Sequence, residues 1–130
     1  MTTVLLLDSQ VALWLLDDSP KLGKLARERI LAADGVHVSA ATVWELTIKS
    51  MLGKLTIPDK FSDLLVEQGL TILPITGEHA EALTAFPELA RHDPFDRLII
   101  AQASLLGLDL LTADHVLLAL GRTFVIDATK

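Results

Sequence analysis

Short apolar runs alternate with helix-like segments along this chain, and no other feature constrains its fold as strongly. Val4–Leu7 is a continuous apolar run that ends at Asp8, which is typical of a strand buried on both faces. Further strands are expected at residues 36–39, 70–75, 108–112 and 123–126. Helices are expected at residues 11–16, 19–33, 41–52, 59–68, 77–86, 94–105 and 114–120. Strands that alternate with helices predict an α/β fold, in which helices cover both faces of a mainly parallel sheet.

The size and composition of the chain narrow the class of protein. Its 130 residues, of which 51% are hydrophobic, suffice for one domain, residues 1–130, with one substantial core. The absence of cysteine excludes disulfides, thiolate nucleophiles and cysteine-ligated zinc. The N-terminus lacks the pattern of a signal peptide, and no apolar run approaches the roughly 18 residues that span a bilayer. We therefore expect a cytoplasmic protein without a membrane contact.

The segment around residues 92–103 has the pattern of a helix start. Asp93 is a good N-cap, because its carboxylate can accept hydrogen bonds from the free amides of the first turn. Pro94 then occupies the first helical position, where the missing N–H costs nothing. Asp96 lies in the first turn, where the helix dipole favours negative charge. These residues alone indicate only a capped helix; a functional role for Asp96 requires other acids nearby.

Two further acids follow strands, and a third lies within a helix. Asp8 ends the first expected strand and Asp114 follows the fourth, so both map to the edge at which α/β sheets bind ligands. Glu45 lies inside the helix at 41–52, where it could simply form an ion pair with Lys49, four residues later. Clustered carboxylates require either cations or raised pKa values. An oxygen-only site selects hard cations such as Mg²⁺ or Mn²⁺ and suits hydrolysis of a phosphodiester or a phosphate monoester.

The net charge of −6 argues against nucleic acid as a partner, because phosphate binding usually requires a basic face. That argument weakens if four of the acids surround cations, since the remaining charge would then be only −2.

The order and spacing of these motifs resemble the PIN-domain ribonucleases, and among them the VapC-type toxins of bacterial toxin–antitoxin pairs. The resemblance covers nearly the whole chain, and it rests on Asp8-Ser9, residues 38–46 with Glu45, Lys49, residues 52–55, residues 92–97 and residues 112–114. It implies a three-layer α/β/α sandwich and an endoribonuclease that leaves 5′-phosphate and 3′-hydroxyl ends. It also implies a cognate antitoxin that silences the RNA-cleaving site, and a homodimer.

The resemblance also assigns roles to individual residues. One or two Mg²⁺ or Mn²⁺ ions would be held by four acids, namely Asp8, Glu45, Asp96 and Asp114. Ser9 and Thr112 would orient those carboxylates through their hydroxyls. Arg97 would contact a substrate phosphate or one of the acids, or else be an ordinary surface arginine. Gln10 departs from the family pattern, in which Asn, Ser, Thr or His often follows the Asp-Ser pair, and this affects the local support of Asp8.

Three alternatives have other functions. A phosphatase of the haloacid-dehalogenase type requires Asp-x-Asp, which Gln10 breaks, and a receiver domain requires an aspartate after its third strand, where this chain has residues 74–76. The third alternative is a PIN fold that only binds another protein.

Of the histidines, His79 is expected to be exposed, and His115 to lie near the site without a catalytic role. Trp14 and Trp44 are expected to pack in the core or in an interface. An antitoxin helix would cross the first helices, on apolar surface offered by Trp14, Leu15, Leu16 and Trp44, and direct an Arg or Lys side chain toward the four acids.

Overall fold

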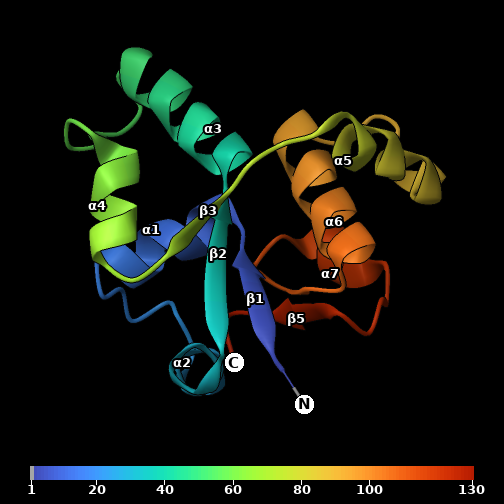
Figure 1. Ribbon diagram of the computed structural model, residues 1–130, viewed down its shortest axis with the longest axis horizontal. Helices are drawn as coiled ribbons and strands as arrows, with labels where there is room; N and C mark the ends of the chain where they lie inside the picture. Colours follow the sequence, from blue (N-terminus) through green and yellow to red (C-terminus); the bar gives the residue numbers. More distant parts are fainter. Residues whose placement is uncertain (1) are drawn as a thin grey trace.

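The computed structural model describes residues 2–130 and contains one five-stranded sheet (Figure 1). Its strands lie in the order β3-β2-β1-β4-β5, and every adjacent pair is parallel. The strands are β1 (Val4–Leu7), β2 (Gly35–Ser39), β3 (Thr71–Leu73), β4 (Asp109–Thr112) and β5 (Val125–Asp127). This arrangement confirms the predicted α/β fold with a parallel central sheet.

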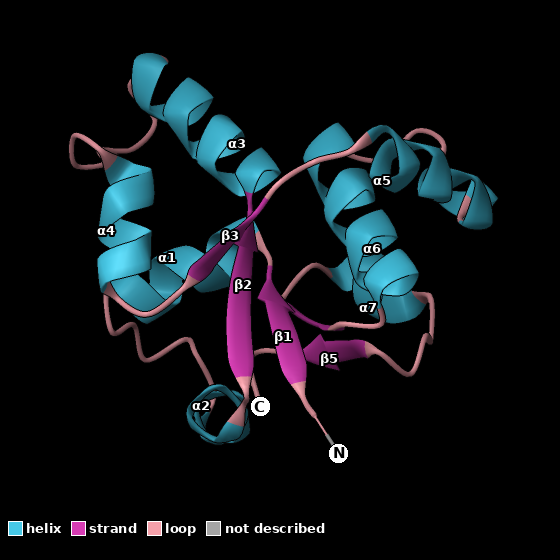
Figure 2. Ribbon diagram, viewed as in Figure 1, coloured by secondary structure: helices cyan, strands magenta, loops and turns pink. Residues whose placement is uncertain are grey.

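Helices cover both faces of the sheet (Figure 2). The helices are α1 (Ser9–Leu16), α2 (Lys24–Ala32), α3 (Ala40–Met51), α4 (Phe61–Glu67), α5 (Gly77–Glu81), α6 (Pro94–Leu106) and α7 (His115–Ala119), with short 3₁₀ helices η1 (Ala82–Ala85) and η2 (Pro87–Leu89). Within residues 2–130, no helix combines the length and the apolar character that crossing a membrane requires.

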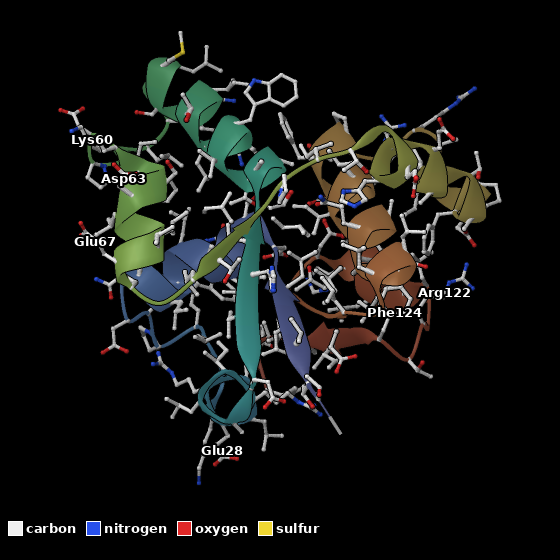
Figure 3. The ribbon with its side chains drawn as sticks, in the orientation of Figure 1. Glu28, Lys60, Asp63, Glu67, Arg122 and Phe124 are labelled. Carbon is white, nitrogen blue, oxygen red and sulfur yellow. The ribbon has the colours of Figure 1, made fainter. Side chains whose placement is uncertain are left out.

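The central strand divides the core into two parts. Leu5 and Leu7 pack into one apolar cluster with side chains of α1, α2 and α4, whereas Leu6 packs into a second cluster with side chains of α6 and α7. Successive side chains of a strand point to opposite faces, so one continuous apolar run fills both clusters. Helix α4 shows the same division on a small scale: Phe61 and Leu65 are buried, while its charged side chains point away from the sheet (Figure 3).

The parallel register brings the ends of β1 and β4 together. Leu7 pairs with Val38 of β2 on one side and with Leu111 of β4 on the other. The chain leaves the sheet at Asp8, whose amide donates a 3.0 Å hydrogen bond to the Leu111 carbonyl. The residues that follow β1 and β4 therefore lie side by side at one edge of the sheet.

The expected helix at residues 19–33 begins later than predicted, at Lys24. Residues 19–22 form a turn, and the Gly23 amide donates to the Ala128 carbonyl instead. A Cβ on Gly23 would lie 2.2 Å from the Lys130 carbonyl carbon, so only glycine allows this close approach. The Leu25 amide then donates to Lys130. Residues more than 100 positions away thus determine the start of α2, which local sequence signals do not reveal.

Other boundaries follow their local signals. Helix α6 begins as predicted: Asp93 Oδ1 accepts hydrogen bonds from the amides of Phe95 at 2.9 Å and Asp96 at 3.1 Å. Its last residue is Leu106, and Gly107 caps it with a φ of 69°, in the left-handed region that favours glycine. The helix expected at 77–86 is instead a short α5 that continues as η1, and the strand expected at 70–75 is reduced to the three residues of β3.

Candidate active site

A cavity of about 510 Å³ opens at the edge of the sheet where β1 and β4 end. All four acids proposed from the sequence line it, and they come from four places in the chain: Asp8, Glu45, Asp96 and Asp114. Asp93 adds a fifth carboxylate to the lining. The fold therefore brings together acids that are up to 106 residues apart in the sequence.

Asp8 is fixed by hydrogen bonds to both of its carboxylate oxygens. It caps α1 by accepting a 2.8 Å hydrogen bond from the Val11 amide, and its other oxygen accepts a hydrogen bond from the Thr112 hydroxyl. The Thr112 oxygen in turn accepts a 3.0 Å hydrogen bond from the Asp114 amide. Burial raises the pKa of Asp8, although the bonds from Thr112 and Val11 act in the opposite direction. One hydroxyl thus connects the ends of β1 and β4.

Glu45 enters the cavity from α3 and is only 7% exposed. Its Oε1 accepts a 2.6 Å hydrogen bond from the Ser9 hydroxyl, which also lies 3.0 Å from the Thr42 hydroxyl. Its Oε2 lies 2.9 Å from Lys49 Nζ. The simple ion pair expected from the spacing is therefore present, but its acid is buried and faces the cavity. The hydrogen bond to Glu45 raises the pKa of Lys49.

Asp96 and Asp114 form an acid pair at the other side of the cavity. Asp114 caps α7 by accepting hydrogen bonds from the amides of Val116 at 2.8 Å and Leu117 at 3.0 Å. Burial, together with the charges of Asp114 and Asp93, raises the pKa of Asp96 to about 8. Burial also acts to raise the pKa of Asp114, but the Leu117 amide and a hydrogen bond from Asp96 outweigh it and lower that pKa. We therefore expect the two carboxyl groups to share one proton at neutral pH.

His92 joins this pair, and the sequence interpretation gave it no role. Its Nε2 lies 3.2 Å from Asp96 Oδ2 and 3.4 Å from Asp114 Oδ2. This nitrogen is buried, and neither contact has the alignment of a hydrogen bond. Ligand atoms of the three residues lie within 4.8 Å of one another, close enough to hold one metal ion. The spacing of four residues between His92 and Asp96 on a helix start was the available signal.

The structure does not bring Arg97 to the acids. Its Nη1 donates a 2.9 Å hydrogen bond to the Ala90 carbonyl, and its side chain lines a different cavity beside Phe86 and Pro87.

The expectation that His79 is exposed is wrong. His79 is buried: it completes a capping box with Thr76, and its Nδ1 lies 3.2 Å from Gln102 Nε2 on α6. His115 lines the acidic cavity, as expected from its place after Asp114.

The lining residues fit a hard divalent cation. Carboxylate oxygens are the ligands that Mg²⁺ and Mn²⁺ prefer, and the cavity gathers five carboxylates around little positive charge. Burial and, after it, the charges of Asp114 and Asp93 raise the pKa of Asp96, as expected where carboxylates lie close together. His92 Nε2, a buried nitrogen without an aligned partner, adds a further donor beside Asp96 and Asp114.

Comparisons with known proteins place this geometry in a family. The model of the PIN domain family matches residues 5–122. The fold is similar to a toxin–antitoxin complex from Klebsiella pneumoniae, with 19% identity over 95% of this chain and 96% of that chain and a TM-score of 0.64. It is also similar to VapBC2 from Rickettsia felis bound to a DNA fragment from their promoter, with 15% identity, the same two coverages and a TM-score of 0.64.

DNA-bound VapBC from Salmonella typhimurium is a third similar structure, with 21% identity over 86% of each chain and a TM-score of 0.60. At these identities the similarity is one of fold. No curated protein matches the chain significantly. Since the family model covers residues 5–122, most of the sequence, this chain belongs to the PIN domain family.

Proposed function

We propose that this PIN domain is a divalent-cation-dependent endoribonuclease and the toxin of a toxin–antitoxin pair. The observation that carries the proposal is the convergence of Asp8, Glu45, Asp96 and Asp114 on one cavity of a PIN fold. The similar solved structures are toxin–antitoxin or VapBC complexes, which supports the second part of the proposal. The haloacid-dehalogenase and receiver alternatives belong to other families, and the non-catalytic binding module remains the contrasting hypothesis.

One or two Mg²⁺ or Mn²⁺ ions would be held by the four acids. Bound there, the cation would lower the pKa of a water and offset the negative charge of a phosphodiester. The residues of the chain itself position the acids: Ser9 holds Glu45, and Thr112 holds Asp8 while it anchors the Asp114 amide. Such supporting hydrogen bonds fix the orientation of ligating carboxylates.

The surface beside the active-site cavity supports an antitoxin partner. A second cavity, of about 390 Å³, lies between α1 and α4 and is lined mainly by apolar side chains, namely Leu13, Leu16, Leu55, Ile57, Phe61 and Leu64. Leu13 lines both cavities, so the second cavity adjoins the acidic one. We propose that an amphipathic antitoxin helix occupies it and directs an Arg or Lys toward the acids.

A separate apolar surface supports the proposed homodimer. Trp44 on α3 is 61% exposed, and its ring contacts that of Phe95 edge to face. Met51 and Leu52, at the far end of the same helix, are also exposed. Exposed aromatic and apolar side chains of this kind are characteristic of protein interfaces.

The test of the catalytic proposal is cleavage of single-stranded RNA by the purified protein in Mg²⁺ and in Mn²⁺. We expect products with 5′-phosphate ends from the wild type and none from Asp96→Asn. Asp109→Asn is the matched control, because it makes the same chemical change at the opposite end of β4 and should leave cleavage intact. A wild type that is inert on RNA with both cations, and harmless when it is expressed alone, would favour the binding module.

A further inference from the structure

Lys49 is the one lysine or arginine among the described residues that line the acidic cavity. It lies on α3, one turn after Glu45, and its side chain is 43% exposed. Arg97 was the candidate for a contact to a substrate phosphate or to one of the acids, but its guanidinium lies elsewhere. The cavity therefore has a basic residue, but a different one from that expected.

The ammonium group of Lys49 has binding capacity beyond its ion pair. It carries three N–H donors, and Glu45 Oε2 is a single acceptor at 2.9 Å. Lys49 lines the cavity together with Asp93 and Asp96, whose charges contribute to raising the pKa of Lys49. Lys49 can thus hold Glu45 and still offer donors to a ligand in the cavity.

A nucleic acid that enters this cavity meets five carboxylates. Divalent cations would offset that charge at the scissile phosphate, but the neighbouring phosphates of the strand need a positive charge of their own. We infer that Lys49 binds a backbone phosphate of the substrate while it remains paired with Glu45. This inference rests on the proposed function, because it names the contact by which the same cavity holds RNA.

The competing role for Lys49 is purely structural, namely to neutralise and orient Glu45. The two roles differ in what they change. A residue that only positions Glu45 affects the catalytic rate, whereas a phosphate contact affects RNA affinity and its dependence on salt. The salt dependence is the more specific readout, because each phosphate neutralised by a protein cation contributes to the slope.

The experiment measures binding of a short fluorescein-labelled single-stranded RNA in Mg²⁺ by fluorescence polarisation over a series of salt concentrations. Asp96→Asn is the parent protein, so that the RNA is not cleaved. Adding Lys49→Gln should weaken affinity about tenfold or more, as for loss of a charged hydrogen bond, and reduce the slope of log Kd against log salt by about 0.7. Lys49→Arg should restore the slope. Lys24→Gln, which removes one exposed charge on α2, should change neither quantity.

The outcomes separate the two proposals. If the parent binds RNA and Lys49→Gln leaves affinity and slope unchanged, the inference about Lys49 is wrong and the proposed function stands. An equal loss in Lys49→Gln and Lys24→Gln would also overturn it, because only net charge would then matter. If the folded parent does not bind RNA and the wild type does not cleave RNA in Mg²⁺ or Mn²⁺, the proposed ribonuclease function fails with the inference.

Discussion

The two sides of the acidic cavity are built in different ways. On the inner side, Asp8 and Glu45 are 4% and 7% exposed, and both oxygens of each carboxylate have a partner. On the outer side, Asp96 accepts no hydrogen bond from a backbone amide or hydroxyl of residues 2–130, and its neighbours are Asp114, Asp93 and His92. The inner acids and Asp114 are held by hydrogen-bond donors, whereas Asp96 has mainly charged neighbours, and burial together with the charges of Asp114 and Asp93 raises its pKa.

The two sides meet two different requirements of a cation site. The ligands must be oriented before the cation binds, and binding of the cation must lower the free energy of the site. Buried carboxylates with fixed donors meet the first requirement. An acid pair that repels itself meets the second, because a cation that replaces the shared proton removes the repulsion. We therefore expect substitutions on the inner and outer sides to have different effects.

The largest expected effect is that of Asp96→Asn on catalysis. Loss of this acid should lower RNA cleavage about a thousandfold or more, as for other groups that stabilise charge in a transition state. The metal-free variant should be as stable as the wild type or more stable, because an amide removes the repulsion with Asp114. Cleavage kinetics and thermal melting in EDTA measure the two effects. A large loss of stability would show that Asp96 is held by favourable contacts, contrary to this comparison.

Thr112→Val tests the inner side. In contrast to Asp96→Asn, it should lower the stability of the metal-free protein. Valine has nearly the same shape, but it leaves an oxygen of Asp8 without its donor and frees the Asp114 amide. We expect a loss of about 1–3 kcal/mol in the free energy of unfolding and a fall of about 10–100-fold in Mn²⁺ affinity. Denaturant melts and calorimetric titration measure them. Thr47→Val is the control, because that exposed hydroxyl on α3 bonds only to the Val43 carbonyl.

The pH dependence of stability should also distinguish the two sides. Asp96 has a pKa of about 8 in the folded protein against an ordinary value of 3.8, so the folded state binds more protons between these values. The metal-free protein should therefore lose stability as pH rises from about 4 to about 8. Asp96→Asn should flatten this slope. Mn²⁺ should raise the melting temperature more at pH 8 than at pH 6, since it replaces the proton; an equal rise at both would contradict the shared proton.

The sequence predicted the four acids for different reasons. Asp8 and Asp114 follow apolar strand runs, and parallel strands end at the same edge, so elementary topology already brings them together. Pro94 marks the first position of a helix, so the sequence already identified Asp93 before it as the cap and Asp96 after it as a first-turn acid. Glu45 could not be placed in this way, because its spacing fits an ordinary ion pair with Lys49. Only the resemblance to PIN-domain ribonucleases assigned it to the site.

Contacts that join distant parts of the chain could not be predicted. The Ser9–Glu45 hydrogen bond spans 36 residues and the Thr112–Asp8 bond spans 104. The resemblance suggested that these hydroxyls orient carboxylates, but not which acid each one holds. The direction of Arg97 and the burial of His79 depend likewise on how η2 and α5 pack against α6. Periodicity describes one element at a time, so it does not contain this information.

The smallest expected effect is that of Asp93→Asn, and it tests whether cap and site are separate. Asparagine also caps helices well, so the stability should change by a few tenths of a kcal/mol at most. Cleavage should remain close to that of the wild type, because Asp93 accepts the amides of Phe95 and Asp96 and is not one of the four proposed ligands. The charge of Asp93 does raise the pKa of Asp96, so its removal should shift the pH dependence of metal-free stability toward lower pH. Thermal melts across pH and cleavage assays on the same samples measure both effects. Loss of cleavage with folding and Mn²⁺ affinity unchanged would move Asp93 from the cap into the catalytic site.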